Sequence, residues 1–400
     1  MTDYEKDVVV YEIARKFFYI LFTIYAAFLI IFAKAENEII ANLSGVVLIA
    51  FFLLYQLFYT SKTFYLNSLL IIYFIFYLFC VLSMTWTIDV DYSSYTVIRM
   101  TQIFINLLLL YNILKIFKVH EAIFTGFLIG IYINIILALE VLIIGNPIYL
   151  KMRFIGTTMH PNTIGLLALF AILGSVLLLQ NAKNRAWIVA NLINILAALY
   201  LIVLTASRSS LIIAVMILLL FLLQVFLNPK SRVYLFLFSG IVFVLFVYFV
   251  DMTKLLESAE FMMQRMAGIL GTLDGQSADG STTERLLFLH IMIDVFKENP
   301  FFGTGVNTSR VFLHGFYSHN NYIEILGALG LFGTLLYYSS YGHLLYKISK
   351  VKDFWTKYYL FVFIAVILIY DFAAVTFYSK SILMMLLVLH FMAEENGQNN

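Results

Sequence analysis

The sequence predicts an all-α protein that crosses a membrane about twelve times. Of its 400 residues, 62% are hydrophobic and only 12% are charged, and its mean hydropathy is +0.94. Soluble domains carry about 25% charged residues, so this composition excludes a water-soluble fold. The net charge of +2 is too small to indicate a nucleic-acid partner. The first apolar run follows the N-terminal segment with no small-residue cleavage site, so we expect a retained helix.

Apolar runs of sufficient length recur along the whole chain. A transmembrane helix needs about 17–25 mostly apolar residues, and only a helix satisfies its backbone within one lipid-embedded segment. We expect one integral membrane domain over 1–400, and the last two of its spans have the least defined boundary. The expected spans lie near residues 14–33, 39–59, 64–84, 97–117, 121–144, 161–180, 187–205, 208–227, 233–250, 321–346, 357–375 and 377–393.

Basic residues in the short loops predict the orientation. An even number of spans puts both termini on one side of the membrane. If that side is the cytoplasm, fourteen of the 25 basic residues fall in cytoplasmic segments and six in the short outer ones. Cytoplasmic loops are enriched in Lys and Arg, so we expect both termini inside. The long segment 251–320 then forms a loop on the extracytoplasmic side.

This long loop has helical patterns of its own. Residues 251–270 show amphipathic spacing, and a Gly/Ser/Asp-rich break follows. Ser281-Thr-Thr-Glu284 matches a capping box and predicts a second helix that Pro300 ends. Arg285 lies in the first turn of that helix. In the next span, three glycines at three-residue spacing (Gly327, Gly330 and Gly333) predict close helix–helix contact.

Polar side chains gather where the outer loop meets this span. His319, Asn320 and Glu324 fall within Ser-His-Asn-Asn-Tyr-Ile-Glu. Polar groups at a lipid boundary are costly to keep without a use, and histidine is a common general base near neutral pH. Catalysis or ligand binding by His319 is therefore expected, and capping of the following helix by the same residue is the alternative.

Arginines at the predicted outer face are candidates for anion binding. The planar guanidinium fork suits phosphate or carboxylate and stays charged, which singles out Arg153, Arg208 and Arg285. Arg208 is flanked by small hydroxyl residues (Thr205 to Ser210) that would leave room for an anion, although a lone arginine there could equally snorkel to headgroups.

No metal or cofactor is expected. The single cysteine, Cys80, lies in an apolar run, and the outer histidines lack His-x-x-x-His spacing. Asp89-Val-Asp91 is similar to the Asp-x-Asp motif of metal-dependent glycosyltransferases, but acidic outer loops also follow from the charge bias. Asp371 could position a substrate or an arginine, or form a salt bridge.

Several of these residues form an ordered series across 151–346 that resembles the bacterial O-antigen ligase and O-antigen polymerase superfamily. Ser-Met-Thr-Trp-Thr-Ile (residues 83–88) is also similar to that family. The series consists of Arg153-Phe-Ile-Gly156, Pro161-Asn162, Gly165, Thr205-Ala-Ser-Arg208-Ser209, Glu284-Arg285, Asn299-Pro-Phe-Phe-Gly-Thr-Gly305 and His319-Asn320-x-Tyr322-x-Glu324.

The resemblance implies a GT-C-like, metal-independent glycosyltransferase at the outer face of the cytoplasmic (inner) membrane. Its donor would be an undecaprenyl-diphosphate-linked oligosaccharide and its acceptor a glycan or lipid A-core. Chain-length regulator and flippase proteins are implied as further partners. Arg208 and Arg285 match arginines that hold the diphosphate, with Arg153 as a third. His319 matches the essential histidine that activates the acceptor hydroxyl, with Asn320, Glu324 and Asn162 in support.

Three functions remain open at this point. The modest loop and the Asn-Asn-Tyr-Ile-Glu form favour a polymerase that builds O-antigen, capsule or exopolysaccharide. A ligase that moves finished glycan to lipid A-core is the alternative within the same class. A transporter or flippase would also fit about twelve spans, but transporters usually show internal repeats and polar groups near the midplane, and neither pattern is evident here.

Overall fold

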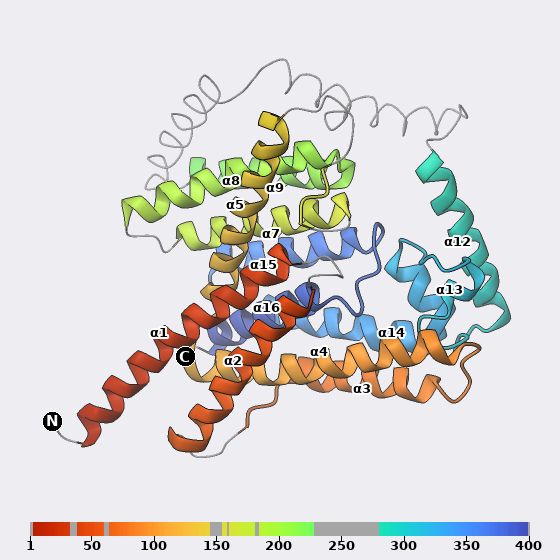
Figure 1. The fold of residues 1–400 in the computed structure, drawn as a ribbon, viewed down its shortest axis with the longest axis horizontal. Coiled ribbons are helices and arrows are strands. Elements are labelled where there is room, and N and C mark those ends of the chain that lie inside the picture. The colour runs from red at the N-terminus through yellow and green to blue at the C-terminus, as the bar shows by residue number, and fades with distance from the viewer. Residues whose placement is uncertain are drawn as a thin grey trace. The chain divides into compact units, whose positions relative to one another are not determined.

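The computed structural model describes residues 3–32, 38–59, 64–144, 154–157, 160–180, 184–227 and 280–398 (Figure 1). Every regular element within these ranges is a helix. The helices are α1 (Asp3–Ile31), α2 (Glu38–Tyr59), α3 (Ser68–Ser83), α4 (Val90–Phe117), α5 (Glu121–Ile144), α7 (Pro161–Gln180), α8 (Arg185–Thr205), α9 (Arg208–Leu227), α12 (Gly280–Glu298), α13 (Ser309–Phe312), α14 (Asn321–Ser349), α15 (Phe354–Tyr370) and α16 (Lys380–Gln398).

Eight helices in the described ranges are long and apolar enough to cross a membrane, which indicates a multi-pass membrane protein. They are α1, α2, α4, α5, α7, α8, α9 and α14, while α3 and α15 are shorter apolar helices. The predicted span 233–250 and the amphipathic stretch 251–270 lie outside the described residues, so the count of twelve stays a prediction. The helix predicted before Pro300 is present as α12.

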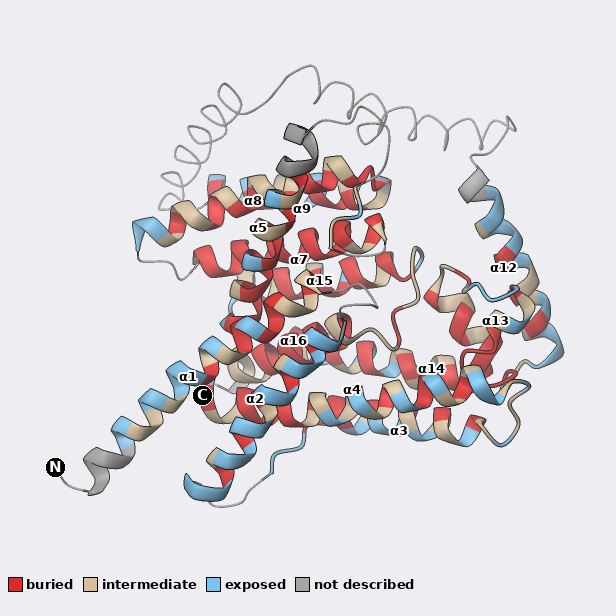
Figure 2. Ribbon diagram, viewed as in Figure 1, coloured by how far each residue is buried: buried red, intermediate tan, exposed pale blue. Residues whose placement is uncertain are grey.

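The chain divides into two compact units. Unit 1 comprises Met1–Leu48 and Glu121–Ala278, and unit 2 comprises Ile49–His120 and Asp279–Asn400. Unit 1 is built around α7, which is buried on almost every side (Figure 2). A helix that is apolar all round is expected at the centre of a bundle. Helices α5 and α8 pack against α7, and α1 packs against α5.

One segment of the family-like series ties the helices of unit 1 together. The Phe154 amide donates to the Leu204 carbonyl of α8 at 3.0 Å. Thr157 donates its hydroxyl to the Ile30 carbonyl at 2.7 Å and its amide to Asn134 Oδ1 of α5 at 3.0 Å. This short stretch therefore connects α1, α5 and α8.

In unit 2, α14 is broken at Gly330, whose φ is 64° and ψ is −165°. The loop after α12 bonds to the backbone groups around this break. The Leu331 amide donates to the Pro300 carbonyl at 2.9 Å, and the Gly305 amide donates to the Ala328 carbonyl at 2.8 Å. The Asn299–Gly305 motif and the glycine-rich stretch of α14 thus pack against each other through backbone hydrogen bonds.

The segment 83–88 at the end of α3, which also resembles the family, bonds to the same loop. The Ile88 amide donates to the Thr304 carbonyl at 3.1 Å, and the Val306 amide donates to Ser83 Oγ at 3.1 Å. Three motifs that are far apart in sequence therefore meet in unit 2 at the Gly330 break of α14.

The expectation of helix–helix contact holds for two of the three glycines in α14. A Cβ at Gly327 would meet the Met292 side chain of α12. A Cβ at Gly333 would lie 3.1 Å from the Phe79 ring of α3, whereas at Gly330 the neighbour is loop backbone. Helical spacing alone could not indicate that the middle glycine breaks the helix.

Replacing Gly330 with alanine is expected to destabilise the protein. A Cβ would overlap the Phe301 carbonyl, and the positive φ disfavours any L side chain. Strain of this kind costs about 1–3 kcal/mol, so the apparent melting temperature in detergent should fall. Gly342→Ala is the control, because nothing lies within 4 Å of its Cβ position. Equal melting temperatures for the two variants would contradict the conclusion that the break in α14 requires glycine at position 330.

Candidate functional site

His319 occupies the apex of a tight turn before α14. Its φ is +56°, in the left-handed region. The residues on both sides are held in place: the Ser318 hydroxyl donates to the Asn320 carbonyl at 2.8 Å, and the Ser318 amide donates to Glu324 Oε2 at 2.9 Å. A non-glycine residue in this conformation costs free energy and marks a candidate site.

The helix cap belongs to the neighbouring asparagine. Asn320 Oδ1 accepts hydrogen bonds from the amides of Tyr322 at 3.0 Å and Ile323 at 3.2 Å. Capping by His319 was the alternative expectation, and Asn320 performs that task. The His319 ring is half-buried, with its centroid 4.3 Å from that of Tyr317.

Glu324 anchors this turn from inside the protein. Its side chain is fully buried, and its carboxylate accepts hydrogen bonds from the Ser309 hydroxyl of α13 and the Ser318 amide. A buried carboxylate with both oxygens bonded to the protein positions its neighbours. Glu324 is therefore suited to holding the His319 turn rather than to direct contact with a ligand.

A second buried polar cluster holds the start of α14 against the turn between α15 and α16. Asn321 Oδ1 accepts from the amides of Thr376 at 2.8 Å and Phe377 at 3.1 Å. The Asp371 carboxylate, also fully buried, accepts from the Tyr338 hydroxyl at 3.0 Å and from Asn321 Nδ2 at 3.3 Å. Asp371 thus contacts amides and hydroxyls, whereas a substrate, an arginine or a salt bridge was expected.

Asn321 was not singled out from the sequence. The available signal was the Asn320-Asn321 pair, in which one asparagine caps the helix and leaves the other facing inward. Only the fold brings residues 371–377 to the inward side, because they lie about fifty positions further along the chain.

Replacing Asn321 with alanine is expected to lower stability strongly. The change removes the acceptor of two buried amides and a donor to Asp371, and each unsatisfied buried group costs about 1–3 kcal/mol. Thermal unfolding in detergent measures the effect. Asn106→Ala is the matched control, since its half-buried side chain donates to the Gln102 carbonyl of its own helix. A loss of thermal stability no larger than that of the control would refute the role of Asn321 in holding α14 against residues 371–377.

Three arginines of unit 2 lie in the region of the His319 turn. Burial raises the pKa of the Tyr317 hydroxyl, while the positive charges of Arg310 and Arg285 oppose that rise. Arg285 was predicted as a site residue, and Arg310 was not. The third, Arg99 of α4, lies over the Tyr378 ring with its guanidinium carbon 5.5 Å from the ring centroid.

The remaining predicted residues belong to unit 1. Arg208 begins α9 two residues after Ala206, which takes the left-handed conformation at φ 46°. Asn162 is buried in the first turn of α7. Arg153 lies outside the described residues, so its predicted role is not addressed by the geometry.

The hydroxyl groups around Arg208 serve packing. Ser207 and Ser210 are each 1% exposed and share a hydrogen bond of 2.9 Å. Gly165 of α7 lets Ser210 approach closely, since a Cβ there would overlap its hydroxyl. These two serines therefore do not provide the open space that the sequence suggested for an anion.

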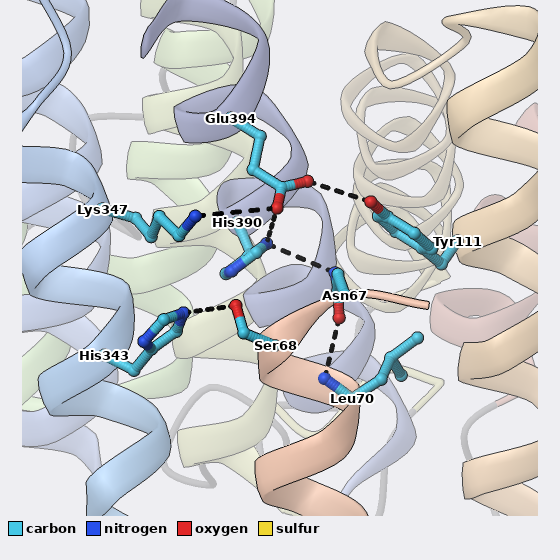
Figure 3. A network of polar contacts seen from close by, with 8 residues as sticks. All are labelled: Asn67, Ser68, Leu70, Tyr111, His343, Lys347, His390 and Glu394. Carbon is cyan, nitrogen blue, oxygen red and sulfur yellow. Dashed lines mark hydrogen bonds and ion pairs between the residues drawn. The ribbon is translucent and has the colours of Figure 1, made fainter. Parts of the chain in front are cut away.

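Another polar network lies towards the opposite end of α14 (Figure 3). His343 Nε2 lies 2.5 Å from Ser68 Oγ, and Asn67 Nδ2 lies 3.3 Å from His390 Nδ1. The two imidazole rings stack at 5.5 Å. His390 is fully buried within unit 2. The network joins α3, α14 and α16 and provides no second catalytic candidate.

The Asp-x-Asp pair has a structural explanation. Asp89 caps α4 by accepting the Tyr92 amide at 2.9 Å. Asp91 is exposed in the first turn of the same helix, where an acidic residue is favourable. Across the described ranges no group of three or more His, Cys, Asp or Glu side chains could hold a metal ion.

Comparison with known families gives one match. Residues 193–338 match a protein-family model described as O-antigen ligase, and no curated protein matches the chain. The matched segment contains Arg208, Arg285, His319, Asn320 and Glu324, whereas Arg153 and Asn162 precede it. The match supports the resemblance to the O-antigen ligase and polymerase superfamily. Members of that superfamily are glycosyltransferase-type enzymes that act on lipid-linked glycans.

Proposed function

We propose that this multi-pass membrane protein, whose residues 193–338 match a family model described as O-antigen ligase, polymerises undecaprenyl-diphosphate-linked oligosaccharides into a surface polysaccharide. The reaction would take place at the outer face of the cytoplasmic membrane, with both termini in the cytoplasm. The family match supports the enzyme class and the lipid-linked substrate. The lean towards polymerisation rests on the Asn-Asn-Tyr-Ile-Glu sequence after His319.

The observation that carries this proposal is the turn at His319. Its neighbours are fixed by Glu324 and by the cap of α14, while the imidazole itself is half-buried and lies beside a group of arginines. A general base needs this combination of a fixed backbone and an accessible ring.

The proposed chemistry is a single displacement. The acceptor hydroxyl oxygen bonds to the anomeric carbon of the donor sugar, and His319 takes the hydroxyl proton. The bond from that carbon to the diphosphate oxygen breaks, and the diphosphate leaves with the electron pair. We assign Arg208, Arg285 and Arg153 to the developing negative charge, because guanidinium groups can neutralise it in a site of low dielectric.

Transfer of finished glycan to lipid A-core is the second candidate, since the matching family is described as O-antigen ligase. Both reactions would use the same donor and the same residues. They differ only in the acceptor, so acceptor choice is the property to measure.

The test uses the full-length protein in liposomes with a purified undecaprenyl-diphosphate-linked repeat unit. A polymerase should yield a ladder of carrier-linked products from this substrate alone. A ligase should leave it unchanged until lipid A-core is added. The assay is repeated with lipid-linked repeat units taken from several different polysaccharides. If none of these substrates gives a product, with or without lipid A-core, the proposed function is wrong.

A further inference from the structure

Two adjacent phenylalanine side chains are exposed in the turn that follows α12. Phe301 and Phe302 are 57% and 52% exposed. The Phe302 ring centroid lies 5.9 Å from that of Trp86 and 5.2 Å from that of Phe332. The Phe301 ring lies 6.2 Å from the same Phe332 ring. The turn therefore presents an aromatic surface that it shares with the segment after α3 and with α14.

The break at Gly330 is the tip at which α14 folds back on itself. Asn321 Nδ2 donates to the Tyr338 hydroxyl at 3.1 Å, although the two residues are 17 positions apart. That separation corresponds to about 25 Å along a straight helix. The rings of Tyr322 and Tyr338 also stack, with their centroids 5.0 Å apart. The two halves of α14 therefore run side by side, and the turn after α12 bonds to the tip where they meet.

The aromatic surface is continuous with apolar side chains that project from α3 and α14. Phe79 of α3 stacks on Phe302, with ring centroids 6.5 Å apart. In a protein that crosses a membrane, exposed apolar side chains on such helices face lipid. The exposed apolar residues next to the rings are Ile75, Leu78 and Leu82 of α3 and Leu331 and Leu335 of α14. The turn thus extends a lipid-facing surface rather than forming a separate patch.

Backbone groups at the tip of the turn have partners within the protein. The Pro300 carbonyl accepts the Leu331 amide at 2.9 Å, and the Phe301 carbonyl accepts the Phe332 amide at 3.2 Å. Pro300 has no N–H of its own. Lipid hydrocarbon offers no hydrogen bonds, so an irregular turn can contact it only when the protein satisfies such groups. These bonds make the turn suited to lipid contact.

Charged side chains mark where the apolar surface ends. Asp294, Lys297 and Glu298 are exposed near the end of α12, and Lys297 Nζ lies 2.8 Å from Asp294 Oδ1. In Figure 1, α12 runs across the direction of α3 and α4, as expected of a helix that lies along a membrane surface. A border between aromatic rings and charges is typical of the level of the lipid headgroups.

We propose that the Pro300–Phe302 turn inserts into the bilayer and anchors the end of α12 at the level of the lipid headgroups. Its partner is the phospholipid leaflet next to the Gly330 break, where the two exposed rings contact the acyl chains. The anchor fixes one end of α12, and Met292 packs the middle of that helix on α14 at Gly327. The anchor is independent of the reaction proposed above, because it concerns lipid contact without substrate.

The test introduces a tryptophan into the turn and measures which quencher reaches it. In the full-length protein, all three tryptophans (Trp86, Trp187 and Trp355) are changed to phenylalanine, and Phe302→Trp is added. Emission should fall in liposomes of dibrominated phosphatidylcholine relative to unbrominated lipid. The factor should approach that of Leu335→Trp on the lipid-facing side of α14. Iodide in solution should leave the emission of Phe302→Trp nearly unchanged.

Phe316→Trp in the same background is the matched control. Phe316 is 56% exposed, but its ring lies beside Phe288 of α12 and not beside the apolar side chains of α3 and α14. Iodide should quench this variant, and brominated lipid should not.

Two results would overturn the anchor. Quenching of Phe302→Trp by iodide but not by brominated lipid would place the turn in water. Protection from both quenchers would indicate that a second copy or another protein covers the surface. If Phe302→Trp does not fold, as judged by its melting temperature, Phe301→Trp is measured instead and the same outcomes apply. No glycan is present in this assay, so its result stands whether or not glycan transfer is observed.

Discussion

Replacing His319 with alanine is expected to reduce glycan transfer by about 10²–10⁴-fold, the usual contribution of a general base. The imidazole would no longer take the proton from the acceptor hydroxyl. Glu324 and Asn320 would still hold the surrounding turn, because their bonds involve the Ser318 amide and the first amides of α14. Product formation in liposomes, measured at equal protein loading, gives the rate.

Two further variants separate the imidazole from the backbone. His319→Asn supplies no base of suitable pKa but tolerates the left-handed conformation, which asparagine adopts readily, so it should be as inactive as His319→Ala. His314→Ala is the control, since this exposed residue also has a positive φ of 52° and lies outside the bonded turn. Wild-type rates in both His319 variants would remove the general-base assignment.

Changing Arg208 or Arg285 to lysine is expected to slow transfer by roughly 10–10²-fold despite the retained charge. A lysine ammonium cannot form the paired hydrogen bonds of a guanidinium with a phosphate group, and each bond lost to a charged partner weakens stabilisation by about 1.5–3 kcal/mol. The loss should appear in kcat as well as in kcat/KM if the arginines act on charge that develops during the reaction.

Arg185→Lys controls for the general effect of the exchange, as this arginine is exposed and lies outside the predicted site. Full activity of both Arg208→Lys and Arg285→Lys would argue against a diphosphate clamp at these positions. Impairment of Arg285→Lys alone would restrict the clamp to the unit that contains His319.

The membrane class and the described helices could be predicted from sequence because lipid imposes a simple rule. A segment in hydrocarbon must satisfy its own backbone, so long apolar runs become helices. The ends were less predictable. Sequence put the last boundary between residues 375 and 377, whereas α15 ends at Tyr370 and α16 begins at Lys380. Apolar residues within that turn extend the hydropathy pattern beyond the helix end.

Residue types at the candidate site were also predictable, since a histidine, asparagines and a carboxylate stand out in an apolar chain. Their individual tasks were not. Sequence left capping and catalysis open for His319, and the structure assigns the cap to Asn320 and the anchor to Glu324. The two tasks differ in which backbone amides each side chain accepts, and the spacing of residues in the sequence does not reveal that.

Sequence by itself determined what this protein is built from: membrane-crossing helices, a polar segment at the end of one of them, and a family-like series of arginines and glycines. Tertiary structure alone decided which distant residues meet. It paired Gly330 with the Pro300–Gly305 loop, Asn321 with Asp371, and Arg99 and Arg310 with Tyr378. The reason is that hydropathy and periodicity indicate only whether a segment faces lipid, water or the protein interior. The contacts between distant segments depend on how those segments pack, which no local sequence pattern encodes.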